Sequence, residues 1–265
     1  MWIDAHCHLD APSLHDPLPV VLSRAQDAQV VAMIAIGVGD QGAAIKEVTT
    51  LADTYSYIYF TAGIHPNDVS TTTENEWALV ETALTHKKCV SLGEVGLDYH
   101  YGVEHKNAQI DLFERMIALG HTHQKPVMLH IRKAHHEAIP LLKKNKSLLK
   151  KPGVVHCFTE HKEIAAQYLD LGFYLSIPGV ATFKNTEALA ETIRYCPRDR
   201  LVIETDSPYL APVPMRGKKN EPSFVPYVGQ KIAELWQLSL EETAWITTRN
   251  AATLFDISVQ QTPVI

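Results

Sequence analysis

The chain has 265 residues, of which 46% are hydrophobic and 20% charged, and its formal net charge at pH 7 is −6. This is enough for a substantial core, in one large α/β barrel or in two smaller domains. The negative charge argues against indiscriminate binding to polyanions, so any nucleic-acid site has to be local. With no run of roughly 18 apolar residues and no signal-peptide core, we expect a soluble cytoplasmic protein without a membrane partner.

Short apolar or β-branched runs recur along the chain and give eight candidate strands, which begin near residues 2, 30, 57, 89, 126, 153, 173 and 200. Segments with helical spacing lie between most of them, for example Ile110, Phe113 and Ile117. This alternation predicts parallel strands with helical crossovers. Eight units predict a closed (β/α)8 TIM barrel, in one domain over residues 1–265. A doubly wound open sheet is the alternative, because periodicity does not reveal closure.

The segment after the eighth run is a Pro-rich stretch, 207–226, followed by helical patterns over 223–237 and 240–255. The second pattern opens with a capping box, Ser239 and Glu242. The lysine-bearing segment 141–151 predicts a solvated face. The four cysteines lie in or beside apolar runs without a CxxC pairing, so we expect buried, reduced thiols, with disulfides as the alternative: Cys7, Cys89, Cys157 and Cys196.

Residues of metal-ligand type recur at the ends of five of these candidate strands. In a parallel barrel the carboxyl ends of the strands converge on one mouth. A lone histidine there is usually a core residue and a lone acid often a cap, but their coincidence at one mouth predicts a metal centre. The candidates are His6 and His8 from the first strand, Glu94 from the fourth, His130 from the fifth, His156 from the sixth and Asp206 from the eighth.

Four imidazoles and two carboxylates exceed the needs of one tetrahedral zinc ion. Such a set suits two divalent ions, with Glu94 as a bridging carboxylate that holds them roughly 3.5 to 4 Å apart. Imidazole ligands favour zinc or manganese over magnesium, but carboxylate and water ligands blur that preference. The cofactor is therefore predicted as two ions of Zn, Mn or Mg.

These residues lie in motifs that resemble the TatD family of metal-dependent deoxyribonucleases, within the amidohydrolase superfamily of TIM barrels. The resemblance runs almost end to end and implies the same six residues as the metal shell. The motifs are WIDAHCHLD at 2–10, GIHP at 63–66, GEVGLDYH at 93–100, PVMLHIRKA at 126–134, HCF at 156–158, IETDSPYL at 203–210 and RGKKNEP at 216–222.

The resemblance also draws attention to residues that could contact a substrate. His65 is expected to bind phosphate or donate a proton, unless it is an ordinary loop histidine. Arg132, Arg216 and Lys218 are expected to hold phosphate oxygens, with exposed cations as the alternative. Glu204, in phase with Asp206 on an extended strand, is expected to orient a metal ligand.

The expected reaction is phosphodiester hydrolysis, in which the ions lower the pKa of a shared water and the resulting hydroxide attacks phosphorus. We expect Glu94, Asp206 and His65 to take part in catalysis, with Asp206 as ligand and proton acceptor. The resemblance implies DNA, or another nucleic-acid-derived substrate, degraded in the 3′ to 5′ direction. The alternatives are an ester or amide hydrolase, such as a D-aminoacyl-tRNA deacylase, and a barrel that binds without catalysis.

Overall fold

The strands form one parallel sheet that closes on itself. The computed structural model describes residues 1–10 and 14–258. The strands pair in chain order: β1 Trp2–Cys7, β2 Val30–Gly37, β3 Ile58–Ala62, β4 Cys89–Asp98, β5 Val127–Arg132, β6 Gly153–Val155, β7 Tyr174–Ile177 and β8 Leu201–Ile203. A parallel bridge from Cys7 to Ser207 joins β1 to the segment after β8. The expected (β/α)8 barrel is therefore confirmed, and the open sheet is excluded.

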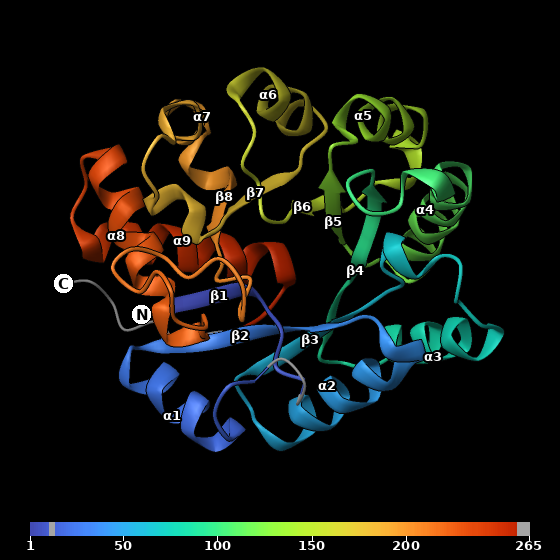
Figure 1. Ribbon diagram of the computed structural model, residues 1–265, viewed down its shortest axis with the longest axis horizontal. Helices are drawn as coiled ribbons and strands as arrows, with labels where there is room; N and C mark the ends of the chain where they lie inside the picture. Colours follow the sequence, from blue (N-terminus) through green and yellow to red (C-terminus); the bar gives the residue numbers. More distant parts are fainter. Residues whose placement is uncertain (11–13, 259–265) are drawn as a thin grey trace.

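Helices surround the strands (Figure 1). Their bounds are α1 Leu18–Asp27, α2 Ala43–Thr54, α3 Glu74–Leu84, α4 Lys106–Thr122, α5 His135–Lys144, α6 Lys162–Asp170, α7 Glu187–Tyr195, α8 Val225–Trp236 and α9 Leu240–Phe255. Single 3-10 turns lie in the connections: η2 Asp40–Gly42, η3 Pro66–Asp68, η4 Val103–His105, η5 Lys146–Leu148, η6 Gly179–Thr182, η7 Arg198–Arg200 and η8 Pro222–Phe224. The predicted capping box of Ser239 and Glu242 is present at the start of α9.

Both faces of the strands are buried. On β2, Ala32 and Ile34 belong to a cluster inside the barrel, whereas Met33 and Ala35 pack with the residues beneath the surrounding helices. This double burial explains why the strands read as continuous apolar runs rather than as alternating patterns. The interior cluster also includes Phe255 at the end of α9, which packs against residues near the amino-terminal ends of the strands. The core therefore seals that end of the barrel and leaves the carboxyl ends for a site.

The ends of three strands differ from the sequence prediction. Glu94 lies inside β4, which continues to Asp98, and His130 lies two residues before the end of β5. Asp206 lies beyond β8, which ends at Ile203. The three residues still reach one mouth, since the loops and the irregular strand β4 direct them there.

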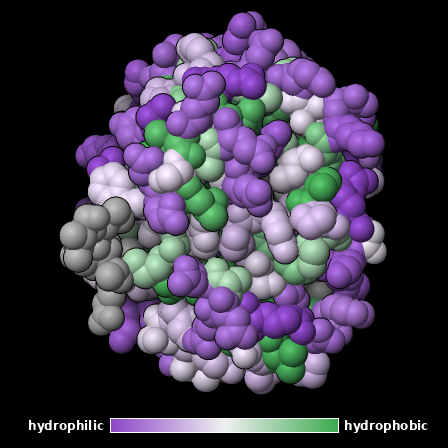
Figure 2. All heavy atoms as spheres, turned by 90° about the vertical axis from the view of Figure 1, so that its left-hand side faces the viewer, coloured by the Kyte–Doolittle hydropathy of each residue, from purple (hydrophilic) through white to green (hydrophobic). Residues whose placement is uncertain are grey.

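The described surface is polar with scattered apolar side chains. Figure 2 shows this on the side where α8 lies in Figure 1. In segment 141–151 the lysines are exposed and Leu142 and Leu149 are buried, as expected for a solvated face. The cysteines are free, and all but the half-buried Cys157 are buried. None of the described helices has the length and apolar content to cross a bilayer.

Candidate active site

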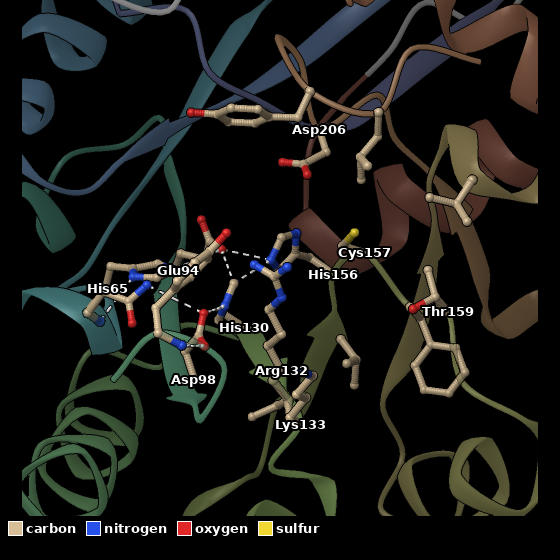
Figure 3. Close-up of a pocket in the computed structure, with 18 of the residues that line it drawn as sticks. His65, Glu94, Asp98, His130, Arg132, Lys133, His156, Cys157, Thr159 and Asp206 are labelled. Carbon is tan, nitrogen blue, oxygen red and sulfur yellow. Dashed lines mark hydrogen bonds and ion pairs between the residues drawn. The ribbon is translucent and has the colours of Figure 1, made fainter. Parts of the chain in front are cut away.

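The six side chains predicted as metal ligands meet at the carboxyl ends of the strands. Five of them line a cavity of about 800 Å³: His8, Glu94, His130, His156 and Asp206. His6 lies just beneath, fully buried, with its ring stacked on that of His156 at a centroid distance of 4.0 Å. Figure 3 shows Glu94, His130, His156 and Asp206 pointing into a common space. Residues from strands far apart in sequence thus form one cluster of donor atoms.

Glu94 reaches the cluster because β4 is irregular at this point. Gly93 has a φ of +148°, and a Cβ atom there would lie 2.6 Å from the carbonyl oxygen of Met128. Only glycine fits such a backbone and so close an approach. The register of β4 against β5 shifts between Leu92 and Val95, as in a β-bulge. The shift lets the Glu94 side chain leave the regular alternation of the strand and enter the site.

The two carboxylate oxygens of Glu94 face different nitrogen atoms. Its Oε1 lies 2.7 Å from His130 Nδ1 and 2.7 Å from His156 Nε2. Its Oε2 lies 3.6 Å from His6 Nε2. On the same side as Oε2, Asp206 Oδ1 lies 3.5 Å from His6 Nε2 and 3.8 Å from His8 Nε2. A carboxylate between two sets of imidazoles offers one oxygen atom to each set.

The electrostatics of this cluster call for cations. Burial alone would raise the pKa of Glu94, yet the histidines around it, His156 first, hold that pKa well below its usual value. Burial, helped by neighbouring carboxylates, raises the pKa of Asp206 to about 8. Burial also keeps the pKa of His6 well below its usual value, so this ring is neutral. Burial would lower the pKa of His156, yet Glu94 and then Glu204 hold it well above its usual value, so this ring carries a proton that a metal ion would displace. Imidazole nitrogens and closely spaced carboxylates are the donor set that divalent metals prefer.

The geometry of the donor atoms fits metal ions as well. Ligand atoms lie within 4.8 Å of one another in three overlapping groups: His6, His156 and Asp206; His6, His8 and Glu94; and His65, Glu94 and His130. The Nε2 atom of His6 is buried and has no hydrogen-bond partner among the described residues. A buried, unpartnered nitrogen costs free energy unless a ligand such as a metal ion satisfies it.

His65 follows β3 and turns one of its ring nitrogens away from the cluster. Its Nδ1 accepts a hydrogen bond from the backbone N–H of Asn67 at 3.2 Å. Burial lowers the pKa of His65 to about 3, so the ring is neutral and its proton lies on Nε2. That Nε2–H points into the site, 3.7 Å from Glu94 Oε1. His65 thus presents a hydrogen-bond donor to the site, although its ring also belongs to the third of the donor groups.

The other predicted substrate residues lie in two different places, one inside the cavity and two outside it. Arg132 lines the cavity next to Lys133, and its guanidinium lies 4.8 Å from the ring centroid of Tyr101. Arg216 and Lys218 are exposed on the loop between β8 and η8 and do not belong to the cavity lining. Arg216 instead stacks on the ring of Phe183 at 3.9 Å.

Glu204 lies behind His156, one of the predicted metal ligands, but not for the reason expected from the sequence. Asp206 has a φ of +53°, so the two acids do not share an extended strand. Glu204 is fully buried, and its Oε1 accepts a hydrogen bond from the backbone N–H of Cys157 at 2.7 Å. The same oxygen lies 3.5 Å from His156 Nδ1. The contact with a ligand histidine therefore arises through a turn and not through strand periodicity.

Comparison with known proteins agrees with this arrangement. A family model described as TatD related DNase matches residues 3–256. The chain belongs to the TatD family. A relative from Bacillus subtilis, the uncharacterized metal-dependent hydrolase YabD, is 38% identical over 97% of this chain and 100% of its own length. YcfH of Escherichia coli K12, also called an uncharacterized metal-dependent hydrolase, is 39% identical over 98% of this chain and 97% of its own.

Solved TatD structures share the fold. The crystal structure of YJJV, a TatD homologue from Escherichia coli K12, superimposes with a TM-score of 0.90 at 28% identity, covering 97% of this chain and 98% of that one. A TatD family hydrolase from Entamoeba histolytica matches with a TM-score of 0.83 at 22% identity, covering 96% and 97% of the two chains. Together with the ligand cluster, these relatives identify the protein as a TatD-type metal-dependent hydrolase.

Two features of this TatD site were not assigned from the sequence. Asp98, which lies in the GEVGLDYH motif and ends β4, contacts His130, and Tyr101 stands at the rim of the cavity with 65% of its surface exposed. One signal for Asp98 was present, since it lies four residues after Glu94 in the same motif. For Tyr101 the sequence offered none, because its place depends on the turn that follows β4.

Proposed function

We propose that this chain hydrolyses phosphodiester bonds of DNA with two divalent ions and releases nucleotides from the 3′ end. The observation that supports this most directly is the content of one cavity. It combines a carboxylate placed between two sets of imidazoles with cationic side chains on the β5 side, Arg132 and Lys133. The description of the matching family model, TatD related DNase, supports the same chemistry.

The proposed metal site consists of His6, His8, Glu94, His130, His156 and Asp206. When bound, the ions supply Lewis acidity and a water molecule of lowered pKa. Glu94 would hold both ions through its two oxygens, since each oxygen faces a different imidazole set. Asp206 would accept the proton of the attacking water, because its Oδ1 lies at the mouth beside His6 and His8.

Phosphate recognition would come from donors around the ligands. The Nε2–H of His65 points toward Glu94 and would donate to a non-bridging phosphate oxygen. Arg132 and Lys133 would neutralise the charge of the scissile group and of the adjacent phosphate. Arg216 and Lys218 lie outside the cavity, so we propose that they contact phosphates farther along the strand. These local cations allow an acidic protein to bind a polyanion.

A nuclease assay with defined metals tests the proposal. The protein is stripped with a chelator, reloaded separately with Mg²⁺, Mn²⁺ or Zn²⁺, and incubated with single-stranded DNA labelled at its 5′ end. The expected product is a ladder that shortens one nucleotide at a time. Glu94→Gln keeps the size of the side chain but removes the charge needed for two ions, and it should abolish the ladder.

Outcomes against the proposal are equally defined. A protein that is inert toward DNA with all three metals, while its Glu94→Gln variant shows the expected loss of bound metal, would be a metal hydrolase for another bond. Parallel assays on D-aminoacyl-tRNA then reveal whether an ester is cleaved instead. An enzyme that starts at the 5′ end would shorten 3′-labelled DNA step by step and would remove the label of 5′-labelled DNA in its first step. That result would contradict the proposed polarity.

A further inference from the structure

The carboxylate of Asp98 is buried at the end of β4, between a metal ligand and a backbone turn. The residue is 1% exposed. Its Oδ2 lies 3.0 Å from Nε2 of His130, and the side-chain amide of Asn67 lies 3.4 Å from the same oxygen. Its Oδ1 accepts hydrogen bonds from the backbone N–H groups of His100 at 2.8 Å and Tyr101 at 3.1 Å. One oxygen of Asp98 therefore faces His130, and the other binds the backbone of the turn. Figure 3 shows Asp98 on the side of His130 away from His156.

The His130 ring presents its two nitrogen atoms to different neighbours. Its Nδ1 faces the cluster, 2.7 Å from Glu94 Oε1 and 3.1 Å from His156 Nε2. Its Nε2 faces Asp98 alone among these groups. A carboxylate offers only lone pairs, so the ring nitrogen opposite it must carry a proton. The proton that a metal ion displaces is then the one on Nδ1.

We infer that Asp98 is a positioning residue, which keeps the proton of His130 on Nε2 so that Nδ1 can donate its lone pair to a metal ion. The inference concerns metal binding and does not depend on which bond the enzyme cleaves. Partners behind histidine ligands commonly fix the tautomer and ring orientation in this way. Here the assignment follows from the positions of four hydrogen-bonding groups around one carboxylate.

The turn after β4 fixes which way Asp98 faces. Two backbone N–H groups converge on Oδ1, so the carboxylate cannot rotate without losing both bonds. Gln109 on α4 holds the backbone of the same residue, accepting from Asp98 N at 2.9 Å and donating to Asp98 O at 3.1 Å. Gln109 is fully buried and does not reach the His130 ring through any of its hydrogen bonds. Gln109 thus supports the backbone of Asp98, whereas only the carboxylate of Asp98 contacts His130.

This geometry predicts an unusual order of effects for two substitutions. In Asp98→Asn, the amide oxygen has to stay opposite the N–H groups of His100 and Tyr101, since an NH2 group there would face two donors. The NH2 group then faces His130 Nε2 and donates to it, which moves the ring proton to Nδ1, where it blocks the metal. Asp98→Ala leaves the ring free to choose its tautomer. The nearly isosteric asparagine should therefore impair metal binding more than alanine does.

A role in holding the turn alone predicts the opposite order, because alanine loses both backbone hydrogen bonds and asparagine keeps them. The matched control is Gln109→Leu, which loosens the same turn without touching the carboxylate. Zinc affinity of each metal-free variant is measured by competition with a chromophoric chelator, and stability by urea unfolding. We expect Asp98→Asn to weaken zinc binding by about 10- to 100-fold, Asp98→Ala to weaken it less, and Gln109→Leu to lower stability with affinity nearly unchanged.

Nuclear magnetic resonance of ¹⁵N-labelled histidine in the zinc-loaded wild-type protein gives a test that needs no variant of Asp98. The expected His130 spectrum has a protonated Nε2 and a zinc-bound Nδ1. A zinc-bound Nε2 would overturn the inference even if the Asp98 variants fail to fold. Equal or greater loss of affinity in Asp98→Ala than in Asp98→Asn, or the same loss in Gln109→Leu, would also overturn it and reduce Asp98 to a support of the turn.

Discussion

Asp4 on β1 accepts two hydrogen bonds from Thr205, at 2.9 Å from its backbone N–H and at 2.6 Å from its hydroxyl group. The Thr205 hydroxyl also accepts from the backbone N–H of Ser207 at 3.2 Å. These bonds join the first strand of the barrel to the turn after the last one. They therefore hold His6, two residues from Asp4, next to Asp206.

We expect Thr205→Val to lower the free energy of unfolding by about 1 to 3 kcal/mol, because the substitution keeps the side-chain shape but leaves buried partners unsatisfied. Urea unfolding of the metal-free protein measures the loss. Thr50→Val is the control, since the Thr50 hydroxyl is exposed and bonds only within its own helix. An equal effect of the two substitutions would show that the Asp4 contact does not stabilise the closure.

Metal binding should release protons and strengthen as the pH rises. In the metal-free protein burial raises the pKa of Asp206 to about 8, so the carboxyl group is protonated below that pH. A metal ion binds the ionised form, so affinity should increase as the pH rises toward and through 8. Calorimetric titration with zinc at pH 7, in two buffers of different ionisation enthalpy, counts the protons released. Asp206→Asn should release fewer, and a wild-type count of zero would contradict the prediction.

Substitution of His65 should reduce turnover without removing metal. The proton on Nε2 makes His65 a donor, so His65→Ala should lower kcat/KM by roughly 100-fold while elemental analysis finds the metal content of the wild-type protein. His65→Gln, which can place an amide N–H in similar space, should recover part of the activity. Metal loss in His65→Ala comparable to that in Glu94→Gln would instead make His65 a ligand.

The two groups of cations should differ in their dependence on substrate length. Arg132 lines the cavity, so Arg132→Ala should weaken binding of a dinucleotide and of a longer oligonucleotide alike, by about 10-fold. Arg216→Ala and Lys218→Ala should leave the dinucleotide unaffected and weaken only the longer strand, with a shallower salt dependence. Fluorescence anisotropy with the Glu94→Gln protein measures binding without cleavage. A loss of dinucleotide binding in Arg216→Ala would place that residue at the scissile phosphate.

The sequence was sufficient to predict the barrel and to select six side chains that meet at its mouth. Strands buried on both faces appear as apolar runs, and ligands at strand ends stand out against those runs, as His130 and His156 do. The closing bridge from Cys7 to Ser207 could not be predicted, because it pairs residues from opposite ends of the chain. The irregular course of β4 was also missed, since Gly93 and Gly96 allow the strand to continue past Glu94 to Asp98.

The contribution of Asp98 was beyond the reach of sequence patterns for a different reason. Its effect depends on which nitrogen atom of His130 it meets, and the two residues come from neighbouring strands. Ring orientation is a property of packed side chains and leaves no periodic signal. The path of the loop after β8 likewise decides that Arg216 stacks on Phe183 and stays outside the cavity.

The packing of Phe255 and Ile257 among the interior residues of the barrel limits how a substrate can reach the site. With the floor filled by the end of α9, a polymer cannot thread through the molecule. Substrate must enter, and product must leave, through the same opening of the cavity above Glu94 and His130. In the proposed nuclease reaction, the released nucleotide would therefore have to leave through that opening before the remaining strand advances.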